Sequence, residues 1–247
     1  MSQNYTSFYI ALRYLKGRKS GFLSFISALA FISTSLGVAV LIIVSSVMNG
    51  FEQELKDRVL NVIPHASIYG LNPIDDWESV EINLREDTNI RGISPYIETE
   101  ALIKSKSAVA GVLVNGVIAS KDKSVSVIHE FMQTGNFEKI QTDNNIVLGR
   151  LLARKLNVDV GDKISLMLPD TSSSFAGYFP RSKVFNISGI FNIGSKDIDE
   201  TLAYISLENA SILSGLKNQV HGFRLKFDDL FEAPYLVWQS LVFAEKN

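Results

Sequence analysis

The side chains that most often ligate metals are few in this sequence and are not grouped. It has no cysteine and three histidines, His65, His129 and His221, which lie far apart with no carboxylate at metal-ligand spacing. The acidic runs Asp75-Asp76 and Asp197-Ile198-Asp199-Glu200 lack the alternating oxygen positions and the glycine of a calcium loop. We therefore expect no metal site. We interpret the histidines as surface or capping residues and the acidic runs as a solvated face.

The motifs of covalent and nucleotide chemistry are missing as well. The sequence contains no G-x-S-x-G nucleophile elbow, no G-x-x-x-x-G-K-S/T phosphate loop and no G-x-G-x-x-G dinucleotide fingerprint. Without cysteine it also has no thiol nucleophile. We expect no catalytic residue and no cofactor, so any work driven by a nucleotide would use ATP hydrolysed by a partner. A membrane-anchored hydrolase is the least favoured class.

One segment has residues suited to contacts rather than to catalysis. Residues 169–182 read PDTSSSFAGYFPRS, and strand-like sequence precedes and follows them. Glycine, two prolines and the polar run 170–174 oppose a strand, yet the segment includes the aromatic residues Phe175, Tyr178 and Phe179. Exposed apolar clusters usually mark contact sites, but the same residues could fold back over the base of their own loop. The sequence leaves both interpretations open.

The composition indicates the class of protein in which these residues lie. The 247 residues are 46% hydrophobic and 20% charged, and the formal net charge is -2. That charge excludes a strongly basic nucleic-acid binder, and the length allows one large or two small globular units. The mean hydropathy of +0.14 is high for a soluble domain. The apolar excess must therefore be concentrated in one part of the chain.

The apolar excess lies near the N-terminus. No charged residue occurs from Ser20 to Phe51, and this stretch exceeds the roughly 20 apolar residues that a membrane-crossing helix needs. Serine and threonine within it can bond back to the preceding turn. We expect an uncleaved transmembrane helix at 22–48. The alternative is a cleaved signal peptide, for which residues 44–46 form a poor cleavage site.

Basic residues crowd the N-terminal side of this span. Arg13, Lys16, Arg18 and Lys19 precede it, and the first acidic residue is Glu52. Because basic flanks stay in the cytoplasm, we expect a cytoplasmic basic leader at 1–21 and an outer domain at 49–247. Residues 5–15 of the leader suit either a short amphipathic helix on the inner membrane surface or a disordered tail.

The outer part begins with a helical pattern and continues as mixed α and β sequence. Apolar residues recur at helical spacing from Phe51 to Val62, and Pro64 ends the pattern, which predicts that the span continues outward as an amphipathic helix. Beyond His65, strands and helices interleave without a strict βαβ order, which predicts an α+β fold. We expect strands at 66–69, 101–104, 111–118, 163–168, 184–191 and 222–227, and helices at 77–86, 150–156 and 207–214.

Several stretches together resemble a known family. ALRY at 11–14, SVMNGFE at 46–52 and VIPH at 62–65 look like the start of the lipoprotein-releasing ABC transporter permeases of the LolC/LolE type, including the fused LolF form. Further on, a recurring element of the periplasmic domains of this family, and of the related MacB and FtsX families, is similar to Leu148-Gly149-Arg150 with Ala153, Leu156, Val158 and Gly161-Asp162. The resemblance covers nearly the whole chain.

The resemblance implies a fold, a function and partners. The implied fold is one transmembrane helix followed by a MacB-like periplasmic domain of two lobes, with a β-rich lobe inserted at about 120–205. The implied function is that of a non-catalytic subunit in the inner membrane that extracts lipoproteins and passes them to a periplasmic carrier. The implied partners are a LolD-type ATPase, a second LolC/LolE-type subunit or a second copy of this chain, a LolA-type carrier and the lipoprotein substrate.

The resemblance also implies site residues. In LolC-type subunits a hook between two strands grips the carrier, and the hook position here is occupied by Phe175, Tyr178, Phe179, Pro180 and Arg181. At the outer end of the span, Met48 and Phe51 would line a cavity for the acyl chains of the lipoprotein. Residues 181–186 are closer to LolC and residues 63–65 closer to LolE, so the subtype stays open.

The family pattern is longer than this sequence. Family members continue for three further spans, and no second membrane-length apolar segment follows here. We therefore expect the 247 residues to be a fragment or a truncated product that does not transport alone. The alternative function is a single-span, membrane-anchored periplasmic binding or sensor module without transport activity, which would bind a soluble ligand in a closed pocket.

Overall fold

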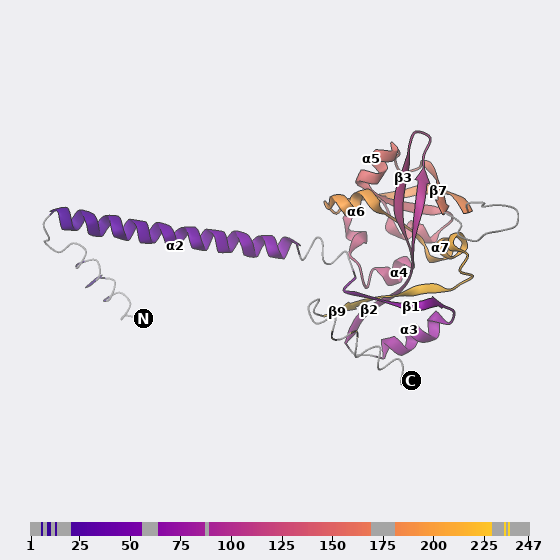
Figure 1. Ribbon diagram of the computed structural model, residues 1–247, viewed down its shortest axis with the longest axis horizontal. Helices are drawn as coiled ribbons and strands as arrows, with labels where there is room; N and C mark the ends of the chain where they lie inside the picture. Colours follow the sequence, from indigo (N-terminus) through magenta and orange to yellow (C-terminus); the bar gives the residue numbers. More distant parts are fainter. Residues whose placement is uncertain are drawn as a thin grey trace. The chain divides into compact units, whose positions relative to one another are not determined.

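A computed structural model describes residues 6, 9, 10, 13, 21–55, 64–86, 89–168, 181–228, 235 and 237. It divides the chain into two units, Met1–Leu55 and Lys56–Asn247. The first unit contains the long helix α2 (Gly21–Leu55), and the second contains a β-sheet with its covering helices (Figure 1). The α+β class expected from the sequence is confirmed.

Helix α2 has the length and composition of a membrane-crossing helix. Its stretch Phe25–Glu52 is apolar enough to span a bilayer, and none of its apolar window is buried against protein. Thr34 Oγ1 donates to the carbonyl oxygen of Ala30 at 2.9 Å, which is the back-bonding expected of hydroxyls in such a helix. The helix is described through Leu55, and the rest of the predicted amphipathic extension, to Val62, lies outside the described residues.

The second unit is built on one nine-stranded sheet. The strand order is β1-β9-β2-β3-β8-β5-β7-β4, and β6 pairs with both β2 and β7. Only β3 with β8 and β5 with β7 are parallel pairs within the described ladders. The strands are β1 (Ala66–Ile74), β2 (Ile90–Lys104), β3 (Val109–Val117), β4 (Met132–Gly135), β5 (Asn145–Gly149), β6 (Lys163–Leu168), β7 (Arg181–Phe191), β8 (Leu202–Ser206) and β9 (Val220–Phe227).

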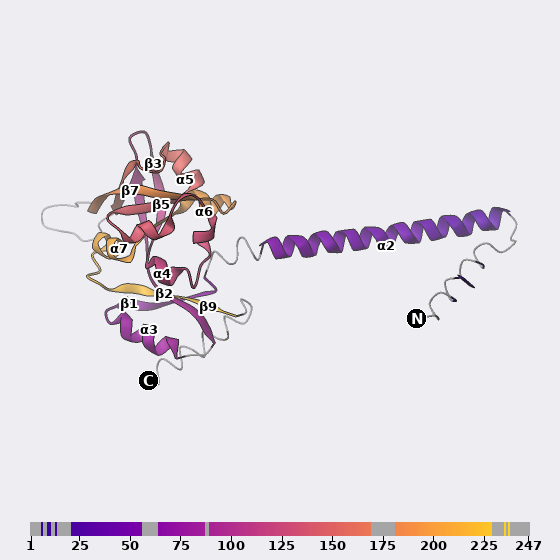
Figure 2. The same cartoon turned by 180° about the vertical axis from the view of Figure 1, so that it is seen from behind.

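Short helices cover the sheet. They are α3 (Trp77–Arg85), α4 (Ala119–Asp122), α5 (Arg150–Leu156), α6 (Lys196–Thr201) and α7 (Leu207–Ser214), with 3-10 turns η2 (Ile128–Phe131) and η3 (Phe137–Gln141). Helix α3 lies beneath β1, β9 and β2 in both views (Figures 1 and 2). All six predicted strands and all three predicted helices of this unit are confirmed. The sequence analysis did not single out β4, β5 and β8, which are four or five residues long.

Strand β2 connects the parts of the sheet. Its residues Ile90–Tyr96 pair with β9, Tyr96–Lys104 pair with β3, and Leu102–Lys104 also pair with β6. A single 15-residue strand therefore carries hydrogen bonds to three neighbours. The division into two lobes, with an inserted lobe at about 120–205, stays a prediction.

The apolar side chains form two buried clusters. The larger one lies between the sheet and helices α3, α5 and α7, and includes the fully buried Phe185 and Phe223. In the smaller cluster, Tyr204 packs edge-on against Phe137 and Phe191, with ring centroids 5.5 and 5.9 Å away. Burial of these side chains is the main favourable contribution to folding.

Two sequence interpretations are resolved by this packing. Asp199 is not part of a solvated face: it is 1% exposed, and its carboxylate accepts the backbone N–H groups of Ile193 and Gly194 at 2.9 and 3.0 Å. A buried carboxylate needs such donors, and the turn preceding α6 supplies them. His65 and His221 do act as caps, since their Nδ1 atoms accept the N–H groups of Phe227 and Glu98.

The packing predicts a large effect at one core position. Replacing Phe185, which is 0% exposed, by alanine should lower the free energy of unfolding by about 3–5 kcal/mol, because a cavity replaces a buried ring. Urea denaturation of the full chain in detergent, followed by circular dichroism, measures this. Val184→Ala on the same strand is the control; Val184 is 55% exposed, so its replacement should cost less than about 1 kcal/mol. Equal losses for the two variants would contradict the packing.

Candidate functional site

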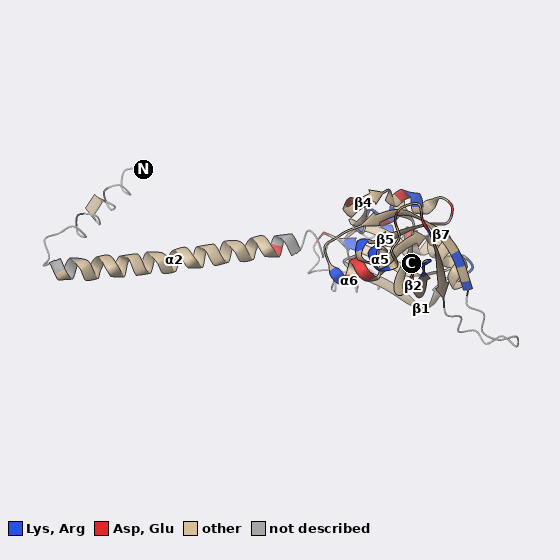
Figure 3. Ribbon diagram, turned by 90° about the horizontal axis from the view of Figure 1, so that it is seen from above, with Lys and Arg blue, Asp and Glu red and all other residues tan. Residues whose placement is uncertain are grey.

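The two residues expected to contact acyl chains lie on α2. Met48 and Phe51 are 65% and 59% exposed, and their spacing of three puts them on one face of the helix. Almost all of this helix consists of uncharged residues, whereas charged side chains are distributed over the second unit (Figure 3). Met48 and Phe51 are thus exposed apolar side chains of α2, and the acidic residue Glu52 follows them directly on the same helix. Their role in lining a lipid cavity stays a prediction.

The predicted hook joins two strands that are paired up to their ends. Antiparallel β6 and β7 are in register from Lys163 opposite Asn186 to Leu168 opposite Arg181. The connection 169–180 therefore starts and finishes at adjacent points of the sheet. Phe175, Tyr178, Phe179 and Pro180 lie outside the described residues. Arg181, the first residue of β7, is the described member of the predicted hook.

Helix α7 fixes the base of this connection. The Arg181 guanidinium packs against Gly215 at the C-terminus of α7, so closely that a Cβ atom on Gly215 would lie 1.8 Å from Arg181 Nη1. Gly215 adopts φ +73°, a left-handed conformation suited to a residue without a side chain. Lys183 Nζ donates to Asn209 Oδ1 on the same helix at 2.6 Å. A cation near the carbonyl end of a helix is favourable, so Arg181 also has a structural role.

A polar cluster that the sequence analysis missed lines an open cavity of about 790 Å³. At its centre is Arg224 of β9, which is 5% exposed. Its Nη2 atom donates to Asn115 Oδ1 and lies 3.6 Å from Glu98 Oε2, and its Nη1 atom lies 3.7 Å from Asp122 Oδ1. The guanidinium carbon is 4.8 Å from the Tyr96 ring centroid. Residues from β2, β3, β9 and α4 thus converge on one buried cation.

Burial dominates the electrostatics of this cluster. It raises the pKa of Asp122 to about 6, and the nearby Arg224 charge only partly opposes the shift. Burial likewise raises the pKa of Tyr96 and of Tyr204. Neither carboxylate oxygen of Asp122 accepts a hydrogen bond from the described residues. The negative charge of Asp122 is therefore poorly compensated by its surroundings.

The groups that line this cavity are suited to binding. Among the described residues, no group of three or more His, Cys, Asp or Glu side chains could hold a metal ion. The cavity contains a cation, aromatic faces and amide and carboxylate oxygens, which recognise polar groups by hydrogen bonds. One sequence signal pointed to it: the predicted strand 222–227 carries the cations Arg224 and Lys226 between apolar residues.

Comparison of the sequence with known proteins identifies a family. The sequence model of the MacB-like periplasmic core domain matches residues 27–230. The chain belongs to this family. The match includes most of α2 and the whole sheet of the second unit.

Individual relatives of this MacB-like chain are longer than it is. It is 37% identical over 245 residues to the lipoprotein-releasing system transmembrane protein LolC of Neisseria meningitidis serogroup B, which covers 97% of this chain and 58% of the relative. Identity to LolC of Xylella fastidiosa (strain Temecula1) is 35% (91% and 54% covered), and to LolE of Haemophilus influenzae 34% (92% and 56% covered). The chain spans somewhat more than half the length of these relatives. The expected resemblance to LolC/LolE-type permeases is confirmed.

Two solved structures are similar to part of this chain. The extracellular domain of the noncanonic ABC-type transporter YknZ from Gram-positive bacteria matches 68% of this chain and 78% of its own, with 8% identity and a TM-score of 0.45. The periplasmic region of MacB from Actinobacillus actinomycetemcomitans matches 66% of this chain and 67% of its own, with 11% identity and a TM-score of 0.41.

The Asp122 environment predicts a pH dependence of the stability of this MacB-like domain. The folded pKa of about 6 exceeds the unfolded value of 3.8, so the contribution of Asp122 to stability is fully present below pH 3.8 and is lost as pH rises through 6. The loss amounts to about 3 kcal/mol at most. Asp122→Asn should remove this part of the pH dependence, as measured by urea midpoints from pH 4 to 7.

A matched control is Asp197→Asn, at an exposed carboxylate on α6. It should keep the wild-type slope of stability against pH. If Asp122→Asn also keeps the wild-type slope, burial does not raise the pKa of Asp122.

Proposed function

We propose that the chain acts as a membrane subunit of a lipoprotein-releasing ABC transporter. The observation that carries this proposal is its 37% identity to a LolC protein over 97% of its own length. In the proposed arrangement α2 crosses the inner membrane with Arg13 on the cytoplasmic side, and the second unit lies in the periplasm. The proposed partners are a LolD-type ATPase, a second permease subunit of the LolC/LolE type or a second copy of this chain, a LolA-type carrier and the lipoprotein.

The physical problem that such a subunit solves is extraction of acyl chains from lipid. Each buried methylene is worth about 0.8 kcal/mol, so spontaneous release of a protein with several acyl chains is negligible. The energy would come from ATP hydrolysed by the partner, and this chain would contribute a passage rather than catalysis. The exposed apolar side chains of Met48 and Phe51 fit that role, since lipid tails pack well against flexible apolar side chains.

The hook would bind the carrier that accepts the lipoprotein from this passage. Its base is rigid, because β6 and β7 are paired to Leu168 and Arg181 and because α7 contacts Arg181 and Lys183. Aromatic residues on a connection between fixed strand ends suit capture of a protein partner. The cavity at Arg224 is open, whereas the alternative of a periplasmic binding module calls for a closed ligand pocket.

The acyl-chain role predicts a pattern of photo-crosslinking in native membranes. A photoreactive benzoylphenylalanine in place of Met48 or Phe51 should crosslink to an acylated lipoprotein and not to the same protein lacking its acylation site. The matched control is Ser46, at similar depth but about 160° around the helix from Met48. Crosslinks of equal yield from Ser46, or crosslinks that do not require acylation, would refute the proposed lipid-contacting face.

The hook role predicts loss of carrier capture. Phe179→Asp should reduce co-purification of a LolA-type carrier with the full chain at least tenfold, because a charged side chain replaces an aromatic anchor. Val160→Asp is the control, since Val160 is 41% exposed in a different turn of the same unit. Undiminished capture by Phe179→Asp would be incompatible with the hook.

A further inference from the structure

A second cavity, of about 370 Å³, lies between α3, the start of β2 and α4. Three of the residues that line it are cationic, Arg85, Arg91 and Lys121, and two carry hydroxyl groups, Ser120 and Ser124. Among the described residues lining the cavity, none is acidic. The positive charge of these residues favours an anion as the ligand.

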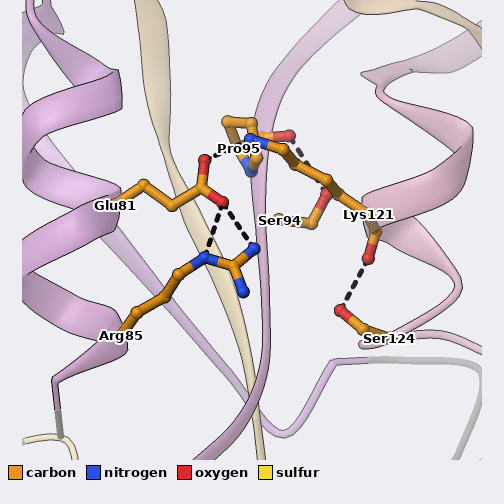
Figure 4. A network of polar contacts seen from close by, with 6 residues as sticks. All are labelled: Glu81, Arg85, Ser94, Pro95, Lys121 and Ser124. Carbon is orange, nitrogen blue, oxygen red and sulfur yellow. Dashed lines mark hydrogen bonds and ion pairs between the residues drawn. The ribbon is translucent and has the colours of Figure 1, made fainter.

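A buried carboxylate holds two of the cations in place. Glu81 of α3 is 4% exposed, and it accepts hydrogen bonds from Arg85 Nε at 3.1 Å and from Arg85 Nη2 at 2.7 Å. Its other oxygen pairs with Lys121 Nζ of α4 (Figure 4). Lys121 Nζ also lies 5.0 Å from the Trp77 ring centroid. One buried acid therefore orients two cations from different helices and neutralises only one of them.

The third cation is anchored at the edge of the same cavity. Arg91 Nε donates to Asp228 Oδ1 at 2.7 Å, just beyond the end of β9. Each guanidinium has five N–H donors, and these carboxylates occupy Nε and Nη2 of Arg85 and Nε of Arg91. The remaining donors suit the oxygens of a phosphate group, which arginine binds through several N–H groups at once.

Two observations favour a lipid over a free anion. Ile82 of α3 is 61% exposed and precedes Arg85 by three residues, so an apolar side chain lies on the same helix face as a cavity cation. The cavity is also at the end of the domain where the chain enters: His65 accepts the N–H group of Phe227, the residue before Asp228.

From this arrangement we infer that the cavity between α3, β2 and α4 binds the phosphate of an anionic phospholipid in the outer leaflet of the membrane that α2 crosses. Basic groups at a membrane surface are attracted to anionic lipid, and Ile82 contacts its apolar region. The inference rests on the proposed function, which places the second unit outside the membrane. It would give the domain a fixed contact with the lipid from which acylated substrates are drawn.

Native mass spectrometry of the full chain, purified in mild detergent, tests the inference. The chain is incubated with phosphatidylglycerol or with phosphatidylcholine, and retained lipid is counted per polypeptide. Wild-type chain should retain phosphatidylglycerol in preference to phosphatidylcholine, and excess inorganic phosphate should displace it. The double variant Arg85→Gln, Arg91→Gln should retain at least tenfold less phosphatidylglycerol per polypeptide. The double variant Lys106→Gln, Arg154→Gln, at two exposed cations in the turn between β2 and β3 and on α5, is the charge-matched control and should behave as wild type.

Each other result overturns the inference. Undiminished retention by the double variant Arg85→Gln, Arg91→Gln excludes the cavity. If that double variant has a lowered thermal unfolding midpoint, the single variants Arg85→Gln and Arg91→Gln are measured instead; each should lose retention while folded, and undiminished retention by both excludes the cavity as well. Equal retention of phosphatidylcholine excludes charge recognition. Binding of inorganic phosphate without phosphatidylglycerol assigns the cavity to a free anion.

A topology measurement separates this failure from failure of the proposed function. Because the chain has no cysteine, Lys106→Cys in the turn between β2 and β3 supplies a unique thiol. Labelling by an impermeant maleimide in spheroplasts is expected. Labelling only after permeabilisation would refute the proposed topology, whereas lipid retention in detergent would report on the cavity independently.

Discussion

The hydrogen-bond ladder of β2 determines where every site of the second unit lies. Arg91 at its start lines the cationic cavity, Tyr96 and Glu98 in its middle contact Arg224, and Leu102–Lys104 at its end pair with β6, which leads to the predicted hook. Side chains alternate between the two faces of a strand, so a slip of one residue would move all of these groups to the opposite face. Three neighbouring strands oppose such a slip, and the sites consequently keep fixed positions relative to one another.

Two of the buried carboxylates of the domain, those of Glu81 and Asp122, lie in contrasting surroundings. Glu81 accepts three polar contacts from Arg85 and Lys121, which offset the loss of its hydration. The carboxylate of Asp122 accepts no hydrogen bond from the described residues, and burial raises its pKa although the Arg224 charge 3.7 Å away partly opposes the shift. Buried ion pairs often contribute little net stability. The Arg224 cluster is therefore better understood as a group that aligns β2, β3, β9 and α4 than as a source of stability.

The sequence predicted those features that depend on neighbours along the chain. The long apolar helix and the strands at 163–168 and 184–191 follow from local hydrophobicity and spacing. The polar clusters were not predictable, because Arg224 is 109 positions from Asn115 and Lys121 is 40 from Glu81. The prediction of a solvated face was wrong for Asp199, because an acidic run does not indicate the turn whose backbone N–H groups bind its carboxylate. The roles of Met48, Phe51 and the hook came from family resemblance rather than from physical reasoning.

The pairing of Leu168 with Arg181 has a consequence for how this family can vary. Since both strands are anchored to the rest of the sheet, the separation of the two chain ends does not depend on what is inserted between them. Lengthening a closed loop costs little, with each doubling adding only about 0.6 kcal/mol of closure entropy. The connection between β6 and β7 can therefore change in length and in sequence while the sheet that holds its two ends stays the same.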